Sequence, residues 1–529
     1  IFIGDGMGPA QVTAARTYLR YIKGIDRLAL DEIYVGQATT YADRGEDGGI
    51  IVSGVVTDSA SAGTAFATGN KTYNAAISVS NEDVAKPFAS VIEAAELAGK
   101  ATGLVTTARI THATPAVYAT HVRNRDNEVA IASQYLESGV DVLLGGGKSY
   151  FLSQADKGRR SDKSIIPDFE AAGYKFIETK SELKALPADA DRVLGLFSDS
   201  HIPYVPDRTD EVPSLAEMTA KALEILEQDE DGFVVMIEGG RIDHASHAND
   251  FPTTVAEMLD FDAAVKAALD YAKQKGNTSV VITADHETGG LSLARDNIYE
   301  LNVDLWDKQK HSSEVLTARL KQAETIEEIK TIVADNTWIT DLTDEEAEYI
   351  WQGDGSSYGR EGGYNAVISK RLLVGWSGHG HSAVDVGIWA YGPIAELVKG
   401  QVDNTDIAKA SARVIGVDLQ AASNLLQSRY LYPKFKITRD NQVLYPARAL
   451  AEALGAEVIW DEASRISTFV YNGSTAHVNL NELAFILNGA ATGLKGDLDN
   501  GQLYLPLEAF NRLTGLHMTW DTLSERIIR

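Results

Sequence analysis

The chain of 529 residues has no cysteine and no apolar run as long as a membrane-spanning helix. Without cysteine there is no disulfide, no thiolate nucleophile and no cysteine-ligated zinc, so any zinc must be held by histidine and carboxylate. Because a spanning helix needs about 18 or more apolar residues, we expect no transmembrane segment. Residues 1–3 read as a strand entering a loop rather than as a signal peptide, which indicates an already trimmed amino terminus.

Positive charge is also scarce. The chain has 48 Lys and Arg against 75 Asp and Glu, which gives a net charge of −27 and a pI near 4.8. Such a surface repels phosphate polymers and anionic lipid, which argues against nonspecific nucleic-acid binding. A phosphate-binding site must therefore be locally positive, and bound divalent cations can make it so. With 44% apolar and 23% charged residues the chain is an ordinary globular protein, long enough for several domains.

Short apolar runs alternate with stretches of helical spacing over most of the first 290 residues. This alternation predicts an α/β fold with helices on both faces of a sheet. The predicted strands are 1–3, 103–106, 140–144, 233–237, 279–283 and, much later, 386–390. The predicted helices include 87–98, with Pro87 in its first turn, 215–227 and 254–273. In such sheets ligands bind beyond the carboxyl ends of the strands, so chemical groups should follow the strands.

Two later segments depart from this alternation. Residues 296–372 hold polar helical stretches and a glycine-rich patch, and we interpret them as an insertion between the last two site-bearing strands. The helical stretches are 313–323 and 344–351, and the patch is 353–363. From residue 431 a near-repeat appears, in which residues 445–461 are echoed sixty positions later. Each copy reads as a helix followed by a strand, which predicts a separate small α+β module over 431–529.

Two segments near the amino terminus have residue types suited to phosphate chemistry. Asp5, between two glycines, places a hard oxygen at the end of the first strand, although such a turn is more often only a turn. Ser59, directly after Asp58, opens a helix of small residues, where free N–H groups and the helix dipole favour an alkoxide and a phosphate oxygen. The alternative interpretation of Asp58 and Ser59 is an ordinary helix cap.

A third segment combines His112, Thr114 and Arg125, the last of which follows Thr114 by eleven residues. The guanidinium fork of Arg125 matches two phosphate oxygens, and the Thr114 hydroxyl can bind a metal ion or its water. Either of these two residues alone would be an ordinary surface group. Their value as evidence comes from the segments around them.

The fourth segment follows the predicted strand 233–237 and holds Glu238, Asp243, His244 and His247. Asp243 and His247 are four residues apart, so on a helical turn they share a face and can bind one cation. A polar helix start is the alternative, but one glutamate, one aspartate and two histidines within ten residues make it the weaker interpretation.

Two more segments add imidazoles. Asp285 and His286 come directly after the predicted strand 279–283 and supply one oxygen and one nitrogen ligand. His381 precedes the predicted strand 386–390 and could complete a three-ligand site. His379, in the same glycine-rich loop, competes for that role.

In this order and spacing, the six segments resemble the alkaline phosphatase family over residues 1–425. The most specific stretch is Asp58-Ser59 with Thr64, Gly69, Lys71, Thr72, Tyr73 and Asn74 behind it. The resemblance implies a catalytic domain at 1–430, a three-layer α/β sandwich with a mostly parallel central sheet. It also implies broad hydrolysis of phosphate monoesters to alcohol and phosphate through a phosphoserine on Ser59. The module at 431–529 resembles the copper amine oxidase N-terminal-like domain, found on bacterial envelope proteins.

The resemblance further implies two zinc ions and one magnesium ion. The implied ligands are Asp243, His247 and His381 for the first zinc, Asp5, Asp285, His286 and the Ser59 oxygen for the second, and Asp5, Thr114 and Glu238 for magnesium. Arg125 would hold two phosphoryl oxygens, with Asp58, His112 and His244 as further substrate-binding residues. Because some members have aspartate at His112 and lysine at His244, the identity of the third ion stays open. We choose His381 over His379 because the residues after it match the family spacing better.

Partners and location are also implied by resemblance alone. We expect small-molecule phosphate monoesters as substrates, a bacterial homodimer, and an extracellular, periplasmic or envelope location, with the module at 431–529 as a candidate envelope contact. His477 and His517 in that module are isolated, and we interpret them as ordinary side chains. Activity should rise with pH and be lost to chelators, because metal ligands must be deprotonated.

Two rival functions remain. One is a phosphodiesterase or sulfatase on the same metal scaffold, against which Ser59 together with Arg125 argues. The other is an inactive binding protein, which would require a missing ligand, and none is missing from the sequence.

Overall fold

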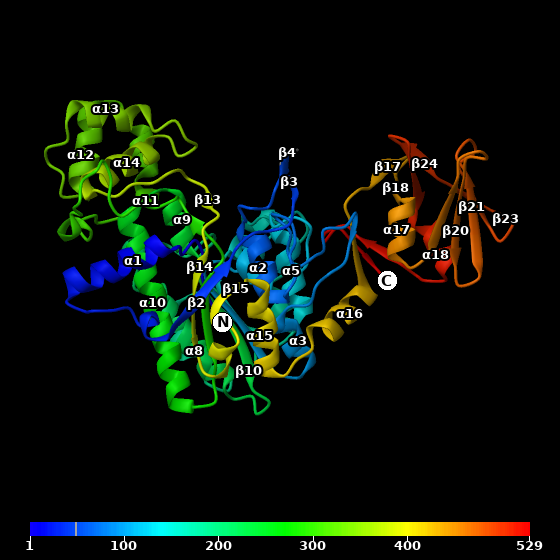
Figure 1. The fold of residues 1–529 in the computed structure, drawn as a ribbon, viewed down its shortest axis with the longest axis horizontal. Helices are drawn as coiled ribbons and strands as arrows, with labels where there is room; N and C mark the ends of the chain where they lie inside the picture. Colours follow the sequence, from blue (N-terminus) through cyan, green and yellow to red (C-terminus); the bar gives the residue numbers. More distant parts are fainter. Residues whose placement is uncertain (48–49) are drawn as a thin grey trace.

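The computed structural model describes residues 1–47 and 50–529 and contains a ten-stranded sheet between two layers of helices (Figure 1). The strand order is β15-β2-β14-β11-β1-β10-β6-β7-β9-β8. Their bounds are Phe2–Gly4 (β1), Tyr34–Thr39 (β2), Ala101–Arg109 (β6), Val142–Gly146 (β7), Lys175–Ile177 (β8), Val193–Leu196 (β9), Phe233–Gly239 (β10), Val280–Ala284 (β11), Val386–Tyr391 (β14) and Gly400–Asp403 (β15). Strand β14 runs antiparallel to β11 and β2, and the other described pairs in this sheet are parallel.

The predicted mostly parallel α/β sheet is therefore confirmed, and each of the six predicted strands lies in it as β1, β6, β7, β10, β11 or β14. Four strands of the sheet, β2, β8, β9 and β15, were not predicted from the sequence. Helices α8 (Leu215–Leu226) and α10 (Phe251–Lys275) match their predictions. The prediction for Pro87 was wrong: helix α3 is Val91–Leu97, and its start is set by the Ser90 and Glu93 capping box.

Helices cover both faces of the sheet. On one side, α1 (Pro9–Tyr18) and α8 each pack against α10, and on the other side α2 (Ser59–Thr68), α3 and α15 (Thr405–Ile415) pack against one another (Figure 1). Their apolar faces join the strands in one buried core. No helix among the described residues combines the length and apolarity that a membrane crossing requires.

The sheet topology brings distant segments to one edge. Gly4 is in register with Gly239 on β10 and with Ala284 on β11, so the residues that follow these three parallel strands lie side by side. Because β14 is antiparallel to β11, its amino-terminal end lies at the same edge. The loop before β14, which carries His381, is thereby brought to the loops after β1, β10 and β11.

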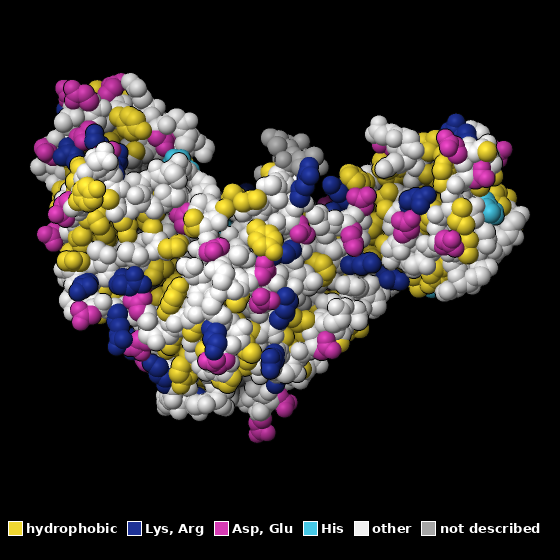
Figure 2. All heavy atoms as spheres, in the orientation of Figure 1, with side chains coloured by type: hydrophobic (Ala, Val, Ile, Leu, Met, Phe, Trp, Pro, Cys, Tyr) yellow, Lys and Arg dark blue, Asp and Glu magenta, His cyan; other side chains and the backbone are white. Residues whose placement is uncertain are grey.

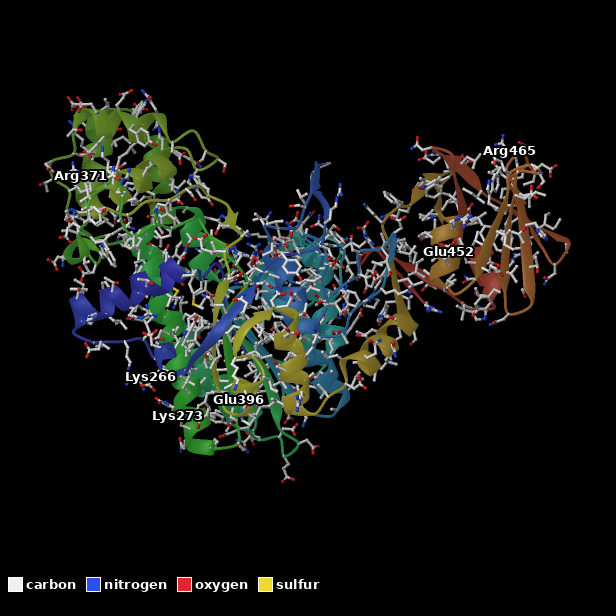
Figure 3. The ribbon with its side chains drawn as sticks, viewed as in Figure 1. Lys266, Lys273, Arg371, Glu396, Glu452 and Arg465 are labelled. Carbon is white, nitrogen blue, oxygen red and sulfur yellow. The ribbon has the colours of Figure 1, made fainter. Side chains whose placement is uncertain are left out.

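The insertion is a helical lobe with its own core around Trp306 and Tyr364. Its helices are α11 (Ser313–Gln322), α12 (Ile326–Asn336), α13 (Asp344–Gln352) and α14 (Arg360–Leu372). Helices α11 and α13 match the predicted stretches, whereas α12 was missed and the end of the glycine-rich patch forms the first turn of α14. Figure 3 labels Arg371 in this lobe, where it pairs with Glu346 and Asp341.

The tail, residues 431–529, is a small lobe on the side of the large α/β domain opposite the insertion lobe, and both lobes are visible in Figure 2. Both sequence copies contain a helix followed by a strand: α17 (Ala447–Ala453) with β19 (Glu457–Asp461), and α18 (Leu507–Thr514) with β26 (Thr519–Asp521). Strand β19 opens a five-stranded antiparallel sheet, and its other four strands lie between the copies: β20 (Ile466–Tyr471), β21 (Ser474–Asn479), β22 (Ala484–Leu487) and β23 (Ala490–Lys495). Figure 3 marks Glu452 and Arg465 on this lobe, which has its own hydrophobic core.

Candidate metal centre and active site

Three groups of side chains at the carboxyl edge of the sheet could each hold a metal ion, because their ligand atoms lie within 4.8 Å of one another. The groups are Asp243, His247 and His381; Asp5, Asp285 and His286; and Asp5, His112 and Glu238. Asp5 belongs to two of the three groups. The structure thus brings together the carboxylates and imidazoles that the sequence scatters over nearly four hundred positions.

In the first group, helix α9 (Arg241–His247) places Asp243 and His247 on one face, as their spacing predicts. Nε2 of His247 lies 3.3 Å from Oδ1 of Asp243, and Nε2 of His381 lies 3.1 Å from Nε2 of His247. Nδ1 of His381 lies 2.8 Å from the carbonyl oxygen of Thr57, and donation to that oxygen leaves Nε2 of His381 free to bind a cation. His379 lies outside this group.

The second group surrounds the hydroxyl of Ser59. Oγ of Ser59 lies 3.2 Å from Nε2 of His286, and that nitrogen lies 3.1 Å from Oδ2 of Asp285 and 3.7 Å from Oδ1 of Asp5. Asp5, Asp285 and His286 are fully buried. The amide of Gly6 donates to Oδ1 of Asp285 at 3.0 Å, which fixes this carboxylate at the end of β11.

The third group joins Asp5 to Glu238 and His112. Thr114 donates to Oδ2 of Asp5 at 3.4 Å, and Thr106 donates to Oε2 of Glu238. Glu238 lies inside β10, where its side chain is fully buried. Thr114 therefore lies beside the group, and His112 adds an imidazole to it.

The donor atoms fit divalent cations. Oδ1 of Asp5 and Oε1 of Glu238 are buried without a hydrogen-bond partner among the described residues. Burial, followed by repulsion from neighbouring carboxylates, raises the pKa of Asp5 well above its usual range, and burial raises that of Glu238 to about 7. Since a buried carboxylate cluster is costly unless a positive charge offsets it, these oxygens suit metal ions.

Ser59 is the first residue of helix α2 and stands at the helix amino terminus. Asp58 is the N-cap, whose Oδ1 accepts from the amide of Ser61 at 2.9 Å. The cap interpretation weighed for this segment thus applies to Asp58. The hydroxyl of Ser59 remains directed at the metal groups and lies near the positive end of the helix dipole.

Arg125 lies between Asp58 and His112. Its Nη1 donates to Oδ2 of Asp58 at 3.1 Å, and its Nη2 donates to Nε2 of His112 at 3.0 Å. Although burial favours the neutral acid, Arg125 and the hydrogen bonds from Ser61 hold the pKa of Asp58 below its usual value. The guanidinium group is thereby oriented from two sides while one fifth of the side chain remains exposed.

His244 lies in a cluster of three imidazoles, of which the sequence analysis identified only two. The His244 ring centroid is 5.3 Å from that of His112 and 4.2 Å from that of His201. The amide of Arg109 donates to Nδ1 of His201 at 3.2 Å, which fixes its ring. His201 stands alone in a loop after β9, and no local pattern in the sequence could have singled it out.

The comparisons with known proteins agree with this geometry. The family model for alkaline phosphatase matches residues 1–417, and the model for the copper amine oxidase N-terminal domain matches residues 430–528. The chain is 39% identical over 420 residues to alkaline phosphatase 3 of Bacillus subtilis, covering 77% of this chain and 87% of that protein. It is 34% identical over 479 residues to the repressible alkaline phosphatase of Saccharomyces cerevisiae, covering 80% and 82%.

Solved structures show the same fold. The cold-active alkaline phosphatase of Shewanella sp. superposes with a TM-score of 0.68 at 35% identity, covering 78% of this chain and 98% of that one. The alkaline phosphatase of Thermus thermophilus gives a TM-score of 0.68 at 30% identity, covering 81% and 94%. A histidine-to-aspartate variant of the enzyme from the Antarctic bacterium TAB5, described with Mg bound in its M3 site, gives 0.58 at 28% identity, covering 79% and 97%.

Proposed function

The chain belongs to the alkaline phosphatase family of phosphomonoesterases, and on that premise we propose that Ser59 is its covalent nucleophile. The observation that carries the proposal is the position of the Ser59 hydroxyl, at the start of α2, 3.2 Å from a nitrogen of the second metal group. The fork of Arg125 on the neighbouring loop, oriented by Asp58, supplies the partner for the phosphoryl oxygens.

In the proposed reaction, the Ser59 hydroxyl gives up its proton and Oγ attacks phosphorus, while the ester oxygen leaves with the bonding electrons and takes up one proton as the alcohol. Arg125 donates to two phosphoryl oxygens and holds phosphorus in line with Oγ. The amino terminus of α2 favours the negative charge that develops beside Ser59. Water then gives up a proton and attacks phosphorus, the bond between Oγ and phosphorus breaks, Oγ takes up a proton to restore the Ser59 hydroxyl, and phosphate is released.

We further propose zinc in the first two groups. Asp243, His247 and His381 offer one oxygen and two nitrogens, and Asp5, Asp285 and His286 offer two oxygens and one nitrogen, both ordinary donor sets for zinc. When bound, such ions would supply Lewis-acid chemistry, because they lower the pKa of a coordinated hydroxyl and offset the charge of phosphate oxygens.

For the third group the family resemblance implies magnesium, held by Asp5, Thr114 and Glu238. His112 changes the chemistry of this group, because imidazole suits zinc and similar transition metals, whereas oxygen ligands suit magnesium. We therefore propose that the third group accepts zinc or a similar transition metal as well as magnesium.

The proposal is tested by Ser59→Ala combined with metal analysis of the purified protein. We expect retained zinc and a fall in phosphate release of at least about a thousandfold, because the reaction loses its nucleophile. Ser133→Ala is the matched control, since the hydroxyl of Ser133 bonds within helix α5 (Glu128–Ser138), outside the three metal groups. Full activity in Ser59→Ala would remove Ser59 from its proposed role.

The rival diesterase function is tested by comparing nitrophenyl phosphate with its bis-ester. A monoester dianion presents three terminal oxygens that share two negative charges, whereas a diester presents two that share one and carries a second alcohol, so the diester is attracted less to Arg125. We expect the monoester to be the better substrate by a large factor, and preference for the diester would favour the rival.

From resemblance alone we also propose a homodimer and a location outside the cytoplasm. Light scattering of the purified protein and cell fractionation check these two points. Deletion of residues 431–529 with unchanged partitioning between medium and cell envelope would count against the tail as an envelope contact.

A further inference from the structure

The tail is joined to the catalytic domain by a shared strand. Strand β16 (Tyr430–Pro433) at the start of the tail pairs antiparallel with β5 (Val84–Ala85) of the catalytic domain, and on its other side with β27 (Arg526–Ile528). Tyr432 is completely buried in a small cluster with Ala76, Val79 and Ala85, all from the catalytic domain. The contact therefore has the character of a core rather than of a loose linker.

Strand β16 lies against residues 75–79, which support the loop that carries Arg125. We call this loop, residues 122–127, the phosphate-binding loop. The amide of Arg125 donates to the carbonyl oxygen of Ala75 at 2.8 Å. The amides of Ile77 and Val122 each donate to the carbonyl oxygen of the other residue. Oδ2 of Asp58 accepts from the amide of Ala75 at 2.9 Å, which ties the same segment to the start of α2. The backbone of Arg125 is thus placed relative to Ser59 through the segment that carries Ala75 and Ile77.

Arg123 and Asn127 lie two positions before and after Arg125, and both donate hydrogen bonds to backbone carbonyl oxygens of the tail. Nη1 of Arg123 donates to the carbonyl oxygen of Tyr432 at 3.0 Å. Nδ2 of Asn127 donates to the carbonyl oxygen of Leu523 at 2.9 Å. The loop is therefore hydrogen-bonded to the tail before and after Arg125, to β16 through Arg123 and to the turn before β27 through Asn127.

An ion pair between buried Arg526 and half-exposed Glu137 holds that turn against the catalytic domain. Arg526, 3% exposed, donates to both oxygens of Glu137 on helix α5 at 2.9 and 2.7 Å, and to Oδ2 of Asp521 at 3.0 Å. Asp521 also accepts from the amide of Leu523 at 3.0 Å. The pair thereby fixes the position of the Leu523 carbonyl that Asn127 uses.

We propose that the tail is a positioning element for the phosphate-binding loop, which sets the affinity for phosphate by holding Arg125 in place. The inference rests on the proposed role of Arg125 as the group that binds phosphoryl oxygens. A guanidinium group binds two oxygens at once only when its position is held within a fraction of an ångström, so loosening the loop weakens binding. This role is independent of any envelope contact, because it uses the inner face of the tail.

The test compares Arg526→Met with Arg439→Met in the full chain. Both residues are tail arginines in carboxylate pairs, but Arg439 pairs with Asp497 and Asp499 inside the tail, whereas Arg526 also reaches the catalytic domain. We expect Arg526→Met to raise the inhibition constant of inorganic phosphate and the KM for nitrophenyl phosphate about three- to tenfold, with zinc content unchanged. Arg439→Met should leave both constants within about twofold.

A second variant distinguishes loss of the tail contact from general misfolding. Asn127→Ser keeps an oxygen that can cap helix α5, the role that Oδ1 of Asn127 now fills, but serine is too short to reach the Leu523 carbonyl. It should weaken phosphate binding in the same direction as Arg526→Met. Calorimetric titration of inorganic phosphate into each variant in the Ser59→Ala background measures binding without turnover.

The proposal is overturned if Arg526→Met and Asn127→Ser bind phosphate as the parent protein does, if Arg439→Met loses the same affinity, or if the loss follows the loss of zinc. Failure of the proposed function looks different. In that case the unaltered protein does not hydrolyse monoesters, or Arg125→Met binds phosphate as tightly as the parent.

Discussion

Nε2 of His379 lies 2.9 Å from Oδ2 of Asp354, so the helical insertion contacts the loop that carries His381. Nδ1 of His379 lies 2.7 Å from the carbonyl oxygen of His247, while Nδ1 of His247 bonds the carbonyl oxygen of His379. Tyr358 of the insertion stacks on the His379 ring at 4.9 Å. His379, rejected as a ligand from spacing, is thus the link between the insertion and the imidazole of His247.

Asp354→Asn should weaken zinc binding by the first metal group, which consists of Asp243, His247 and His381. Replacing the carboxylate lowers the strength of its bond to His379, which orients His247, and outer partners of metal ligands typically contribute tenfold or more in affinity. We expect about tenfold weaker zinc retention, measured by titration with a competing chelator. Asp341→Asn is the control, because Asp341 pairs with Arg371 on the outside of the insertion. Equal zinc retention in both variants would separate the insertion from the metal centre.

Arg125→Lys should lower kcat/KM for a monoester by about ten- to a hundredfold. A lysine ammonium cannot donate to Asp58 and His112 from a planar fork while also binding two phosphoryl oxygens. Steady-state kinetics at constant zinc measures the loss, with Arg192→Lys, near Tyr174, as the control. A kcat/KM within twofold of the parent would show that positive charge alone suffices.

His112→Asp should shift the third group towards magnesium. The substitution replaces the imidazole with a carboxylate, so the group becomes an all-oxygen set with Asp5 and Glu238. We expect activity to become more dependent on added magnesium, measured as the concentration for half-maximal stimulation after dialysis. The same magnesium response in parent and variant would mean that His112 does not face the third ion.

Glu96→Gln should stabilise the protein at pH 8 relative to pH 5. Burial raises the pKa of Glu96 to about 7 in the folded chain, although Thr102 donates to its carboxylate. Because the folded pKa lies above the ordinary value near 4.5, the stability linked to this proton is present below about pH 4.5 and is lost as pH rises through 7. Glutamine at position 96 has no carboxyl proton to release, so the variant does not lose this stability as pH rises.

We expect the gain of Glu96→Gln over the parent to be about 1–2 kcal/mol larger at pH 8 than at pH 5, since partial exposure reduces the full effect. Urea unfolding with saturating zinc at both pH values measures it. Glu170→Gln, an exposed carboxylate, is the control. A gain for Glu96→Gln that is the same at both pH values would contradict the assigned ionisation.

Much of the fold followed from local patterns. The apolar runs that became β1, β10 and β11 end in polar residues, and this pattern depends only on the chain within about ten residues. The short strands β2, β8, β9 and β15 carry weaker patterns, because they lie towards the sheet edges or are only a few residues long. Helix α12 lay in a polar stretch, where its amphipathic face was difficult to recognise.

The sequence by itself determined two of the pairs that could hold a metal ion, since Asp243 with His247 and Asp285 with His286 are local pairs whose geometry follows from a helical turn or a strand end. Only the tertiary structure decided what those pairs meet. The antiparallel direction of β14 brings His381 into the first group, the loop after β9 adds His201, and the tail bonds both sides of the Arg125 loop. The physical reason is that these contacts join segments about 90 to 400 residues apart, whose meeting depends on strand register and packing rather than on any local preference of the chain.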